Sequence, residues 1–392
     1  MRKITKIVAL ALMVILSMTV IAGCGATKAE TFMIGGIGPI SGPNAAYGLG
    51  VQNGAQIAVD EINAAGGING LEIQFNMQDD EADAEKAVNA YNTLKDWGMN
   101  ILMGTVTSGA CISVIDLTEA DNMFQITPSA SAIDVVTDND NVFQVCFSDP
   151  NQGVGAAQYI GQQGIQSADG TNVSKVAVIY DSSDPYSSGI YEKFTEEAAN
   201  QDFEIVASEA FTADSKTDFS VQLQRARDAG ATLVFLPIYY TEAALILTQA
   251  DGMDYAPIFF GCDGIDGILT NVENFDASLA EGMILLTPFA ADEDDEKIQA
   301  FVTEYQARHN EVPNQFAADA YDAIYAIKAA IETSGVTYDQ SISEICEGMK
   351  VAMTEITIDG LTGLGLSWTA SGEVNKEPKA MSIVNGSYQL IQ

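Results

Sequence analysis

The sequence predicts an α/β protein built from two doubly wound lobes, each a parallel sheet with helices on both faces. Strand-like and helix-like patterns alternate from Thr31 onward, and the same alternation restarts after Asp149. Successive strand–helix units of this kind form parallel sheets. A chain of 392 residues usually divides into two domains. Its hydrophobic content of 47% supports packed cores rather than disorder.

The first series of elements covers the first third of the chain. Apolar runs and alternation predict strands at 31–37, 71–77, 100–103 and 123–127. Helical spacing of apolar residues predicts helices at 51–62, 84–94 and 110–120. Gly66 and Gly67 end the first of these helices. This order predicts the first lobe.

The second series follows the same rule. Strands are expected at 175–180, 204–211, 232–236, 257–260 and 283–287. Helices are expected at 191–200, 219–229, 242–251, 294–309, 316–334 and 342–353. Near the end of the chain, Asn385-Gly386 between two apolar segments indicates a β-hairpin. The second lobe is therefore expected to resemble the first.

The first residues are typical of an export signal. Arg2, Lys3 and Lys6 precede the apolar run 7–21, and Ala22-Gly23-Cys24 follows it. The run is shorter than the roughly 20 apolar residues that a transmembrane helix needs. A small-residue cleavage site that ends on cysteine resembles the bacterial lipobox, which implies cleavage before Cys24 and lipid on its sulfur and amine. An uncleaved anchor, or secretion with Cys24 incidental, is the alternative.

The charge of the chain excludes one class of partner. Lys and Arg number 17 against 54 Asp and Glu, a formal net charge of −37. Nucleic-acid binding draws on a basic surface, so we expect no nucleic-acid partner. A solvated acidic surface that aids solubility also explains this composition.

Signals for catalysis or for a metal are weak. His309 is the single histidine, so a Ser-His-Asp or Cys-His catalytic site would have to include this residue. The cysteines after Cys24 form no Cys-x-x-Cys pair, and we expect them to be buried free thiols. A glycine-rich turn at 36–42 contains Pro39, which lacks the amide that a dinucleotide phosphate would need. We therefore expect no enzyme activity, cofactor or metal.

Ligands of open parallel sheets bind beyond the carboxyl ends of the strands, so the loops after the strands are the candidate site. These loops carry Tyr47, Ser108, Ser129, Ser131, Tyr186, Tyr239 and Asp263. Hydroxyls just before helix starts suit a carboxylate, and an aspartate suits an ammonium. Tyrosines supply apolar cover with a polar tip. Ordinary helix caps, turns and packing would also explain each residue singly. Together they suit a zwitterion held between two lobes.

Four segments of the chain resemble the branched-chain amino-acid binding proteins, the type I periplasmic receptors of ABC importers. The segments are 38–43 (Gly-Pro-Ile-Ser-Gly-Pro) with Tyr47-Gly48, 64–70, 78–80 and 126–131 (Ile-Thr-Pro-Ser-Ala-Ser). The resemblance implies two lobes joined by three hinge crossings, which close on a solute. We expect the crossings near 146–150, 286–288 and 364–368.

The domain boundaries expected from this resemblance divide the chain into four parts. Residues 1–23 are the signal peptide with its lipobox, and 24–30 form a linker. Residues 31–147 with 287–365 form the first lobe, and 148–286 with 366–392 form the second. The expected location is extracytoplasmic, at the outer face of the cytoplasmic membrane or in the periplasm.

The resemblance also implies roles in the first lobe. Ser108 corresponds to a serine that holds the ligand carboxylate. Ser129 corresponds to a residue whose carbonyl contacts the ammonium, and Ser131 to one that contacts the ligand through hydroxyl and backbone. Tyr47 matches an aromatic residue near the ligand side chain.

In the second lobe, Tyr186 and Tyr239 match aromatic residues that close over the ligand. Asp263 lies where amino-acid binders of this family place an acidic partner for the ammonium. In the best-known leucine/isoleucine/valine binder that acid is glutamate. The shorter side chain of Asp263 could therefore change how far its carboxylate reaches towards the ligand.

The function expected from these features is capture of a small, aliphatic or branched-chain, amino acid and its delivery to an ABC permease and its ATPase. The protein is expected to be a monomer, tied to the membrane through lipid on Cys24. A receptor of the same fold for an amide, a urea or an aromatic acid is the alternative, as is a sensor. An exported hydrolase is a more distant one.

Overall fold

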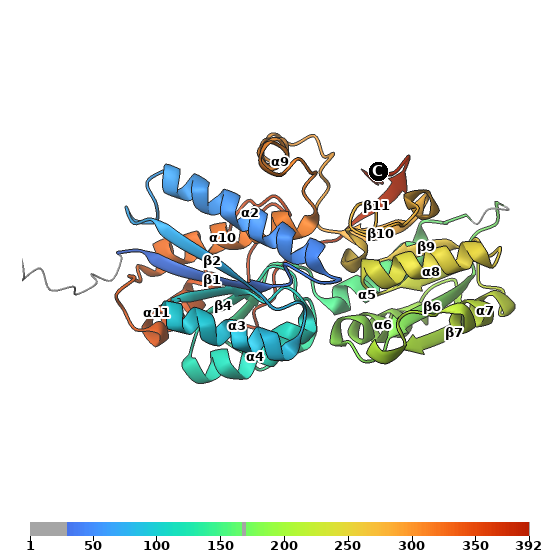
Figure 1. The fold of residues 1–392 in the computed structure, drawn as a ribbon, viewed down its shortest axis with the longest axis horizontal. Helices are drawn as coiled ribbons and strands as arrows, with labels where there is room; N and C mark the ends of the chain where they lie inside the picture. Colours follow the sequence, from blue (N-terminus) through green and yellow to red (C-terminus); the bar gives the residue numbers. More distant parts are fainter. Residues whose placement is uncertain (1–29, 167–169, 392) are drawn as a thin grey trace, which may run out of the picture. The chain divides into compact units, whose positions relative to one another are not determined.

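The computed structural model describes residues 30–166 and 170–391. The signal peptide and Cys24 lie outside the described residues, so the lipobox stays a prediction. The described chain contains two separate sheets, one in each of two lobes (Figure 1). The fold class predicted from the sequence is confirmed.

The first lobe contains a five-stranded sheet in which all strands are parallel. In spatial order the strands are β2 (Ile73–Asp79), β1 (Phe32–Gly38), β3 (Ile101–Gly104), β4 (Gln125–Thr127) and β5 (Val142–Gln144). The central strand β1 is buried on both faces, since Ile34 packs with one group of helices and Ile37 with another. A near-continuous apolar strand of this kind is typical of parallel sheets.

Helices cover both faces of this sheet (Figure 1). One face carries α2 (Ala45–Ala64), α10 (Gln315–Ser334) and α11 (Ile342–Met353). The other face carries α3 (Ala84–Trp97) and α4 (Ser108–Asp121). The longest helices, α2 and α10, pack closely: a side chain at Gly54 would meet the backbone of Ala317 at 2.0 Å. Glycine at this position permits that approach.

The second lobe contains a seven-stranded sheet. In spatial order its strands are β12 (Ser387–Leu390), β11 (Lys379–Val384), β10 (Ile284–Thr287), β9 (Ile258–Gly261), β8 (Leu233–Leu236), β6 (Lys175–Asp181) and β7 (Glu204–Phe211). One face packs on α5 (Asp149–Gln162) and α6 (Pro185–Ala198), and the other on α7 (Ser220–Asp228) and α8 (Tyr240–Gly252). The five strands from β10 to β7 are parallel.

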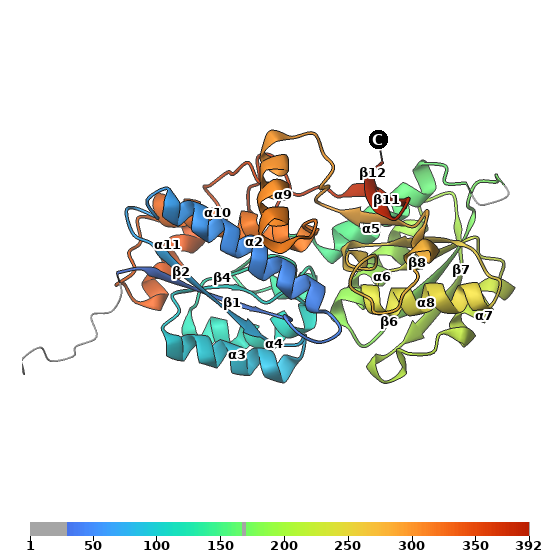
Figure 2. The same cartoon turned by 45° about the horizontal axis from the view of Figure 1, so that its top comes forward.

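The antiparallel strands β11 and β12 form the expected hairpin (Figure 2), and β11 pairs with β10. Val384 pairs with Ser387 across a two-residue turn. Asn385 and Gly386 both have positive φ, at 52° and 72°, which is the backbone that an Asn-Gly turn favours.

Two elements were not expected from the sequence. The helix α5 begins with Asp149-Pro150 and contains Gly153, Gly155 and Gly161. These residues are typical of loops, yet proline is tolerated in the first turn of a helix. Glycine at position 153 permits close packing of the two helices, because a side chain there would meet the backbone of α6 at 2.6 Å. The strand β5 is only three residues long.

Three crossings join the lobes, and the third lies later than expected. The first runs from β5 to α5, and the second from β10 to α9 (Glu296–His309). The segment after Trp368 stays with the first lobe: the indole of Trp368 donates to the Gln144 carbonyl at 2.7 Å, and the Gln144 amide donates to that of Gly372 at 2.9 Å. The chain therefore reaches the second sheet only at Lys379, where β11 begins.

A buried ion pair fixes the chain just before this third crossing. The ammonium of Lys376 lies 2.7 Å from the Asp319 carboxylate on α10, and both side chains are almost fully buried. The same ammonium contacts the hydroxyl of Thr362. Breaking a buried pair by removing one partner is strongly destabilising, so this anchor holds the crossing to the first lobe.

Candidate functional site

One pocket gathers most of the residues predicted from the sequence. Its lining residues are Tyr47, Val106, Thr107, Ser108, Ser129, Tyr186, Tyr239, Asp263, Gly264 and Phe316. All but Phe316 follow the carboxyl ends of β1, β3, β4, β6, β8 and β9, where a parallel sheet binds its ligands. Phe316 comes from the first turn of α10. Of the predicted site residues, only Ser131 is absent from the lining.

The first lobe offers an anion site at the amino end of α4. Thr107 precedes the helix, and its buried hydroxyl has no hydrogen-bond partner. The amides of the first turn, from Ser108 to Ala110, lack partners within the helix. The oxygen of the Ser108 hydroxyl accepts from the Ala132 amide at 3.1 Å, which leaves the hydroxyl hydrogen free to donate. Unpaired amides and hydroxyls at a helix start favour a carboxylate.

The two other predicted serines, Ser129 and Ser131, differ in their position relative to the pocket. Ser129 lines the pocket, but its hydroxyl donates to the Val106 carbonyl at 2.7 Å, so its backbone carbonyl is the group left for a ligand. Ser131 is fully buried behind the pocket. Its carbonyl accepts from the Asp149 amide at 2.9 Å. The structure therefore places Ser131 beside Asp149 rather than on the pocket wall.

The second lobe offers a buried carboxylate, Asp263, at the start of a short 3-10 helix, η3 (Asp263–Ile265). Oδ1 accepts from the Tyr186 hydroxyl at 2.7 Å, and the Asp263 amide donates to Oε1 of Gln152 at 3.2 Å. Burial raises the pKa of Asp263 to about 7, against the lowering effect of the Tyr186 hydrogen bond. None of the pocket-lining residues is basic, so a cationic group of a ligand would be the counter-ion.

Aromatic rings form the apolar walls. Tyr186 and Tyr239 stack with their ring centres 5.0 Å apart, and Tyr47 lies 5.7 Å from Tyr239. Phe316 packs on Tyr47 at 4.4 Å. Rings in such contact exclude water from the polar groups they surround. The walls are therefore suited to a short apolar side chain.

Hydrogen bonds between the lobes close this ring of side chains. The Tyr47 hydroxyl on α2 donates to the Gly264 carbonyl at 2.5 Å and accepts from the Tyr240 amide at 3.3 Å. The space left inside is about 10 Å³, roughly what one water needs. An amino acid therefore enters only if the lobes or the ring move apart, as expected of a hinged receptor.

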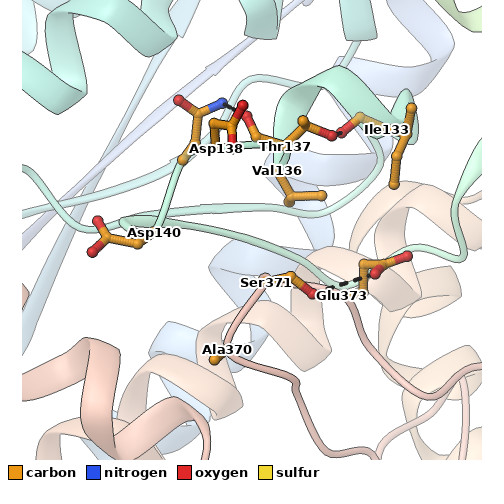
Figure 3. A pocket seen from close by; sticks show the side chains of 9 residues that line it. Ile133, Val136, Thr137, Asp138, Asp140, Ala370, Ser371 and Glu373 are labelled. Carbon is orange, nitrogen blue, oxygen red and sulfur yellow. Dashed lines mark hydrogen bonds between the residues drawn. The ribbon is translucent and has the colours of Figure 1, made fainter.

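A second, larger hollow lies elsewhere, between the turn before β5 and the loop at 370–373 (Figure 3). Its volume is about 660 Å³. Asp138, Asp140 and Glu373 line it, and Asp140 pairs with Lys350 at 2.8 Å. Within the described part of the chain, no three His, Cys, Asp or Glu side chains are arranged to hold a metal ion. The turn leads into the amino end of β5, so this hollow lies away from the sheet edge that binds ligands.

Four pocket residues were missed by the sequence reasoning. Val106 and Thr107 directly precede Ser108, and the run Thr105-Val-Thr-Ser108 was a signal for further hydroxyls at that helix start. Gly264 follows Asp263. Phe316 had no such signal, because α10 follows α9 rather than a strand and reaches the pocket only through its packing on α2.

Comparison with known proteins agrees with this architecture. The family model described as "Periplasmic binding protein" matches residues 31–384. The chain belongs to this family. Periplasmic binding proteins work outside the cytoplasm, and the family is one of solute receptors rather than of enzymes. In residues 30–166 and 170–391, no helix combines the length and the apolar character needed to cross a membrane.

Curated relatives of this periplasmic binding protein are named as amino-acid receptors. One is the leucine-, isoleucine-, valine-, threonine- and alanine-binding protein of Pseudomonas aeruginosa, which is 29% identical over 81% of this chain and 82% of its own. Another is Leu/Ile/Val-binding protein homolog 3 of Brucella melitensis, which is 30% identical over 79% of this chain and 80% of its own.

Solved structures show the same fold. The branched-chain amino acid transporter substrate binding protein of Streptococcus pneumoniae, in complex with isoleucine, has a TM-score of 0.81 and 30% identity. It covers 92% of this chain and 99% of its own. A solute binding protein of R. palustris in complex with benzoate has a TM-score of 0.79 over 93% of this chain and 96% of its own. At 19% identity, that likeness concerns the fold alone.

Proposed function

We propose that this protein is an extracytoplasmic receptor for a small aliphatic amino acid, which it delivers to an ABC importer. The observation that carries the proposal is the polarity of the pocket. The α4 start offers hydroxyls and unpaired amides in one lobe, and Asp263 offers a buried carboxylate without a counter-ion in the other. A zwitterion satisfies both ends at once.

The roles of the individual residues follow from this polarity. The ligand carboxylate binds Thr107, Ser108 and the α4 amides. The ammonium binds Asp263 and the Ser129 carbonyl. Tyr47, Tyr186 and Tyr239 cover the side chain. The Pseudomonas aeruginosa relative is named for leucine, isoleucine, valine, threonine and alanine, which supports a small side chain.

A ligand screen tests this proposal. The protein without residues 1–23 is heated with each amino acid, and in parallel with urea, short amides, benzoate and 4-hydroxybenzoate. We expect a rise in melting temperature with leucine, isoleucine, valine or alanine, because a ligand that binds only the folded state stabilises it. A shift with benzoate and none with any amino acid would favour the aromatic-acid receptor. The solute should be recovered unchanged, whereas a hydrolase would convert it.

The membrane anchor is a separate part of the proposal. The lipobox sequence at 21–24 supports attachment of lipid to Cys24. In cells, we expect the protein in the membrane fraction and Cys24→Ala released from it or left uncleaved. An unchanged membrane fraction with a processed Cys24→Ala chain would contradict lipid attachment at this residue.

Transport needs its own measurement. Cells that lack this protein but keep the neighbouring permease and ATPase should lose uptake of the labelled amino acid found in the screen. Uptake that persists unchanged, with binding intact in the purified protein, would favour a sensor instead.

A further inference from the structure

Two tyrosines, one from each lobe, make hydrogen bonds to each other's helix. Tyr47 lies in the first turn of α2 in the first lobe, and Tyr240 is the first residue of α8 in the second. The hydroxyl of Tyr47 accepts from the Tyr240 amide at 3.3 Å, and the hydroxyl of Tyr240 accepts from the Ala46 amide at 3.4 Å. Both rings are almost fully buried, and they meet edge to face with their centres 5.1 Å apart.

The two amides that these hydroxyls accept from lie at the starts of their helices. The first four amides of a helix have no acceptor within that helix and need one from elsewhere. The residues before the helices, Asn44 and Tyr239, make no side-chain capping hydrogen bond. The tyrosine hydroxyls therefore take the place of helix caps, but they do so only while the lobes are together.

Two more hydrogen bonds join the lobes beside the tyrosine pair. The Tyr47 hydroxyl donates its hydrogen to the Gly264 carbonyl at 2.5 Å, so it is used both as donor and as acceptor. Towards the solvent, the Thr241 hydroxyl donates to the Pro43 carbonyl at 3.0 Å. The start of α2 is thus bonded to the second lobe at several neighbouring points.

The second lobe makes room for this contact at Gly267. The residue has a φ of 118°. A side chain there would lie 3.0 Å from the ring of Tyr240 and 3.4 Å from Cβ of Ala46. Glycine at this position therefore lets the ring and the start of α2 come together.

These bonds between the lobes do not use the polar groups that we assign to the solute. Those groups belong to Thr107, Ser108, Ser129 and Asp263, whereas Tyr240 and Thr241 do not line the pocket. The bonds can therefore form with or without a solute. The space inside the closed ring is about 10 Å³, so a closed, empty protein has to open before an amino acid can enter.

We propose that Tyr47 and Tyr240 form a latch that holds the lobes together in the absence of solute as well as in its presence. Because entry and exit both require an open cleft, the latch slows both. The inference goes beyond the proposed function, since it concerns the closing of the lobes and not the identity of the solute.

The test compares Tyr240→Phe with Tyr255→Phe by stopped-flow fluorescence, with isoleucine as the probe. Tyr240→Phe keeps the ring but leaves the Ala46 amide buried without an acceptor in the closed form. We expect release of isoleucine to become about tenfold faster, because an unpaired buried donor is costly. Association should also become faster, by the ratio of the open fractions of the two proteins.

Tyr255 is the matched control. It is buried, and its hydroxyl donates to the Ala231 carbonyl at 2.9 Å within the second lobe. Tyr255→Phe should leave both rates unchanged, even if it lowers the melting temperature. A merely structural weakening does not speed up association. Unchanged rates in Tyr240→Phe, or faster release without faster association, would overturn the latch.

Small-angle X-ray scattering of the ligand-free proteins tests the latch without any solute. We expect Tyr240→Phe and Thr241→Val to have a larger radius of gyration than the wild type and than Tyr255→Phe. Thr241→Val loses only a half-buried hydroxyl, and it decides the question if Tyr240→Phe does not fold. Radii equal to that of the wild type would overturn the inference. If the wild type binds no amino acid, the proposed function fails, while this measurement still decides the latch.

Discussion

The two walls of the pocket differ in chemistry. The first-lobe wall holds hydroxyls and helix amides, and its polar groups are neutral: Thr107, Ser108 and Ser129. The second-lobe wall holds the buried carboxylate of Asp263. In both lobes the pocket residues follow the carboxyl ends of parallel strands, although the second sheet also carries the antiparallel strands β11 and β12. The difference therefore comes from the loop residues, and it teaches that the fold supplies a cleft while a few side chains give the cleft opposite poles.

Replacing Asp263, the acidic group of the pocket, should have the largest effect on ligand affinity. Asp263→Asn keeps the shape and the acceptor for Tyr186 but removes the charge that faces the ammonium. We expect a loss of about 2–5 kcal/mol in binding, measured by calorimetry with isoleucine. Asp266→Asn is the control, because Asp266 is buried on the same segment, accepts from the Gln315 amide at 3.0 Å and does not line the pocket. Equal affinities in both variants would remove Asp263 from the site.

Replacing the hydroxyls of Thr107 or Ser108 should have a smaller effect on ligand affinity. In Thr107→Val, a hydroxyl that has no partner in the ligand-free protein is lost, so stability should not fall. Affinity for isoleucine should fall by about 1.5–3 kcal/mol, typical of a hydrogen bond to a charged group. Ser108→Ala should lose affinity and stability together, because the Ala132 amide also loses its acceptor. Unchanged affinity in both variants would move the ligand carboxylate elsewhere.

Lowering the pH should raise the stability of the ligand-free protein and lower its affinity for isoleucine. The folded pKa of Asp263 is about 7, above its unfolded value near 3.9. The ligand-free protein therefore binds more protons than the unfolded chain between these values, and its stability should rise as pH falls from 8 to 5.

Isoleucine affinity should fall over the same range, by at most about 1.4 kcal/mol per pH unit for one proton, because the ammonium needs the ionised carboxylate. Thermal melts and titrations from pH 5 to 8 measure both. Asp263→Asn should show a flatter affinity profile. An isoleucine affinity that increases towards low pH would contradict the ionised Asp263 as the partner of the ammonium.

The fold could be predicted from the sequence because short apolar strands alternate regularly with helices that carry an apolar face. The helix α5 could not, since Gly153, Gly155 and Asp149-Pro150 favour a loop, and tertiary packing on α6 decides otherwise. The sequence pattern therefore predicts only a boundary between the lobes near Asp149, and not the helix that begins there. The rule that ligands lie beyond strand ends selected Ser108, Tyr239 and Asp263, and the structure brings these three residues to one pocket. Their contact with a ligand stays a prediction. It could not find Phe316, whose helix follows no strand.

The most direct test of a pocket with two opposite poles is a crystal structure of the protein with isoleucine bound. We predict the ligand between the lobes, with its carboxylate at the α4 start on Thr107 and Ser108, and its ammonium within hydrogen-bond distance of Asp263. A ligand bound in the reverse orientation, or outside this pocket, would contradict the assignment of the two poles.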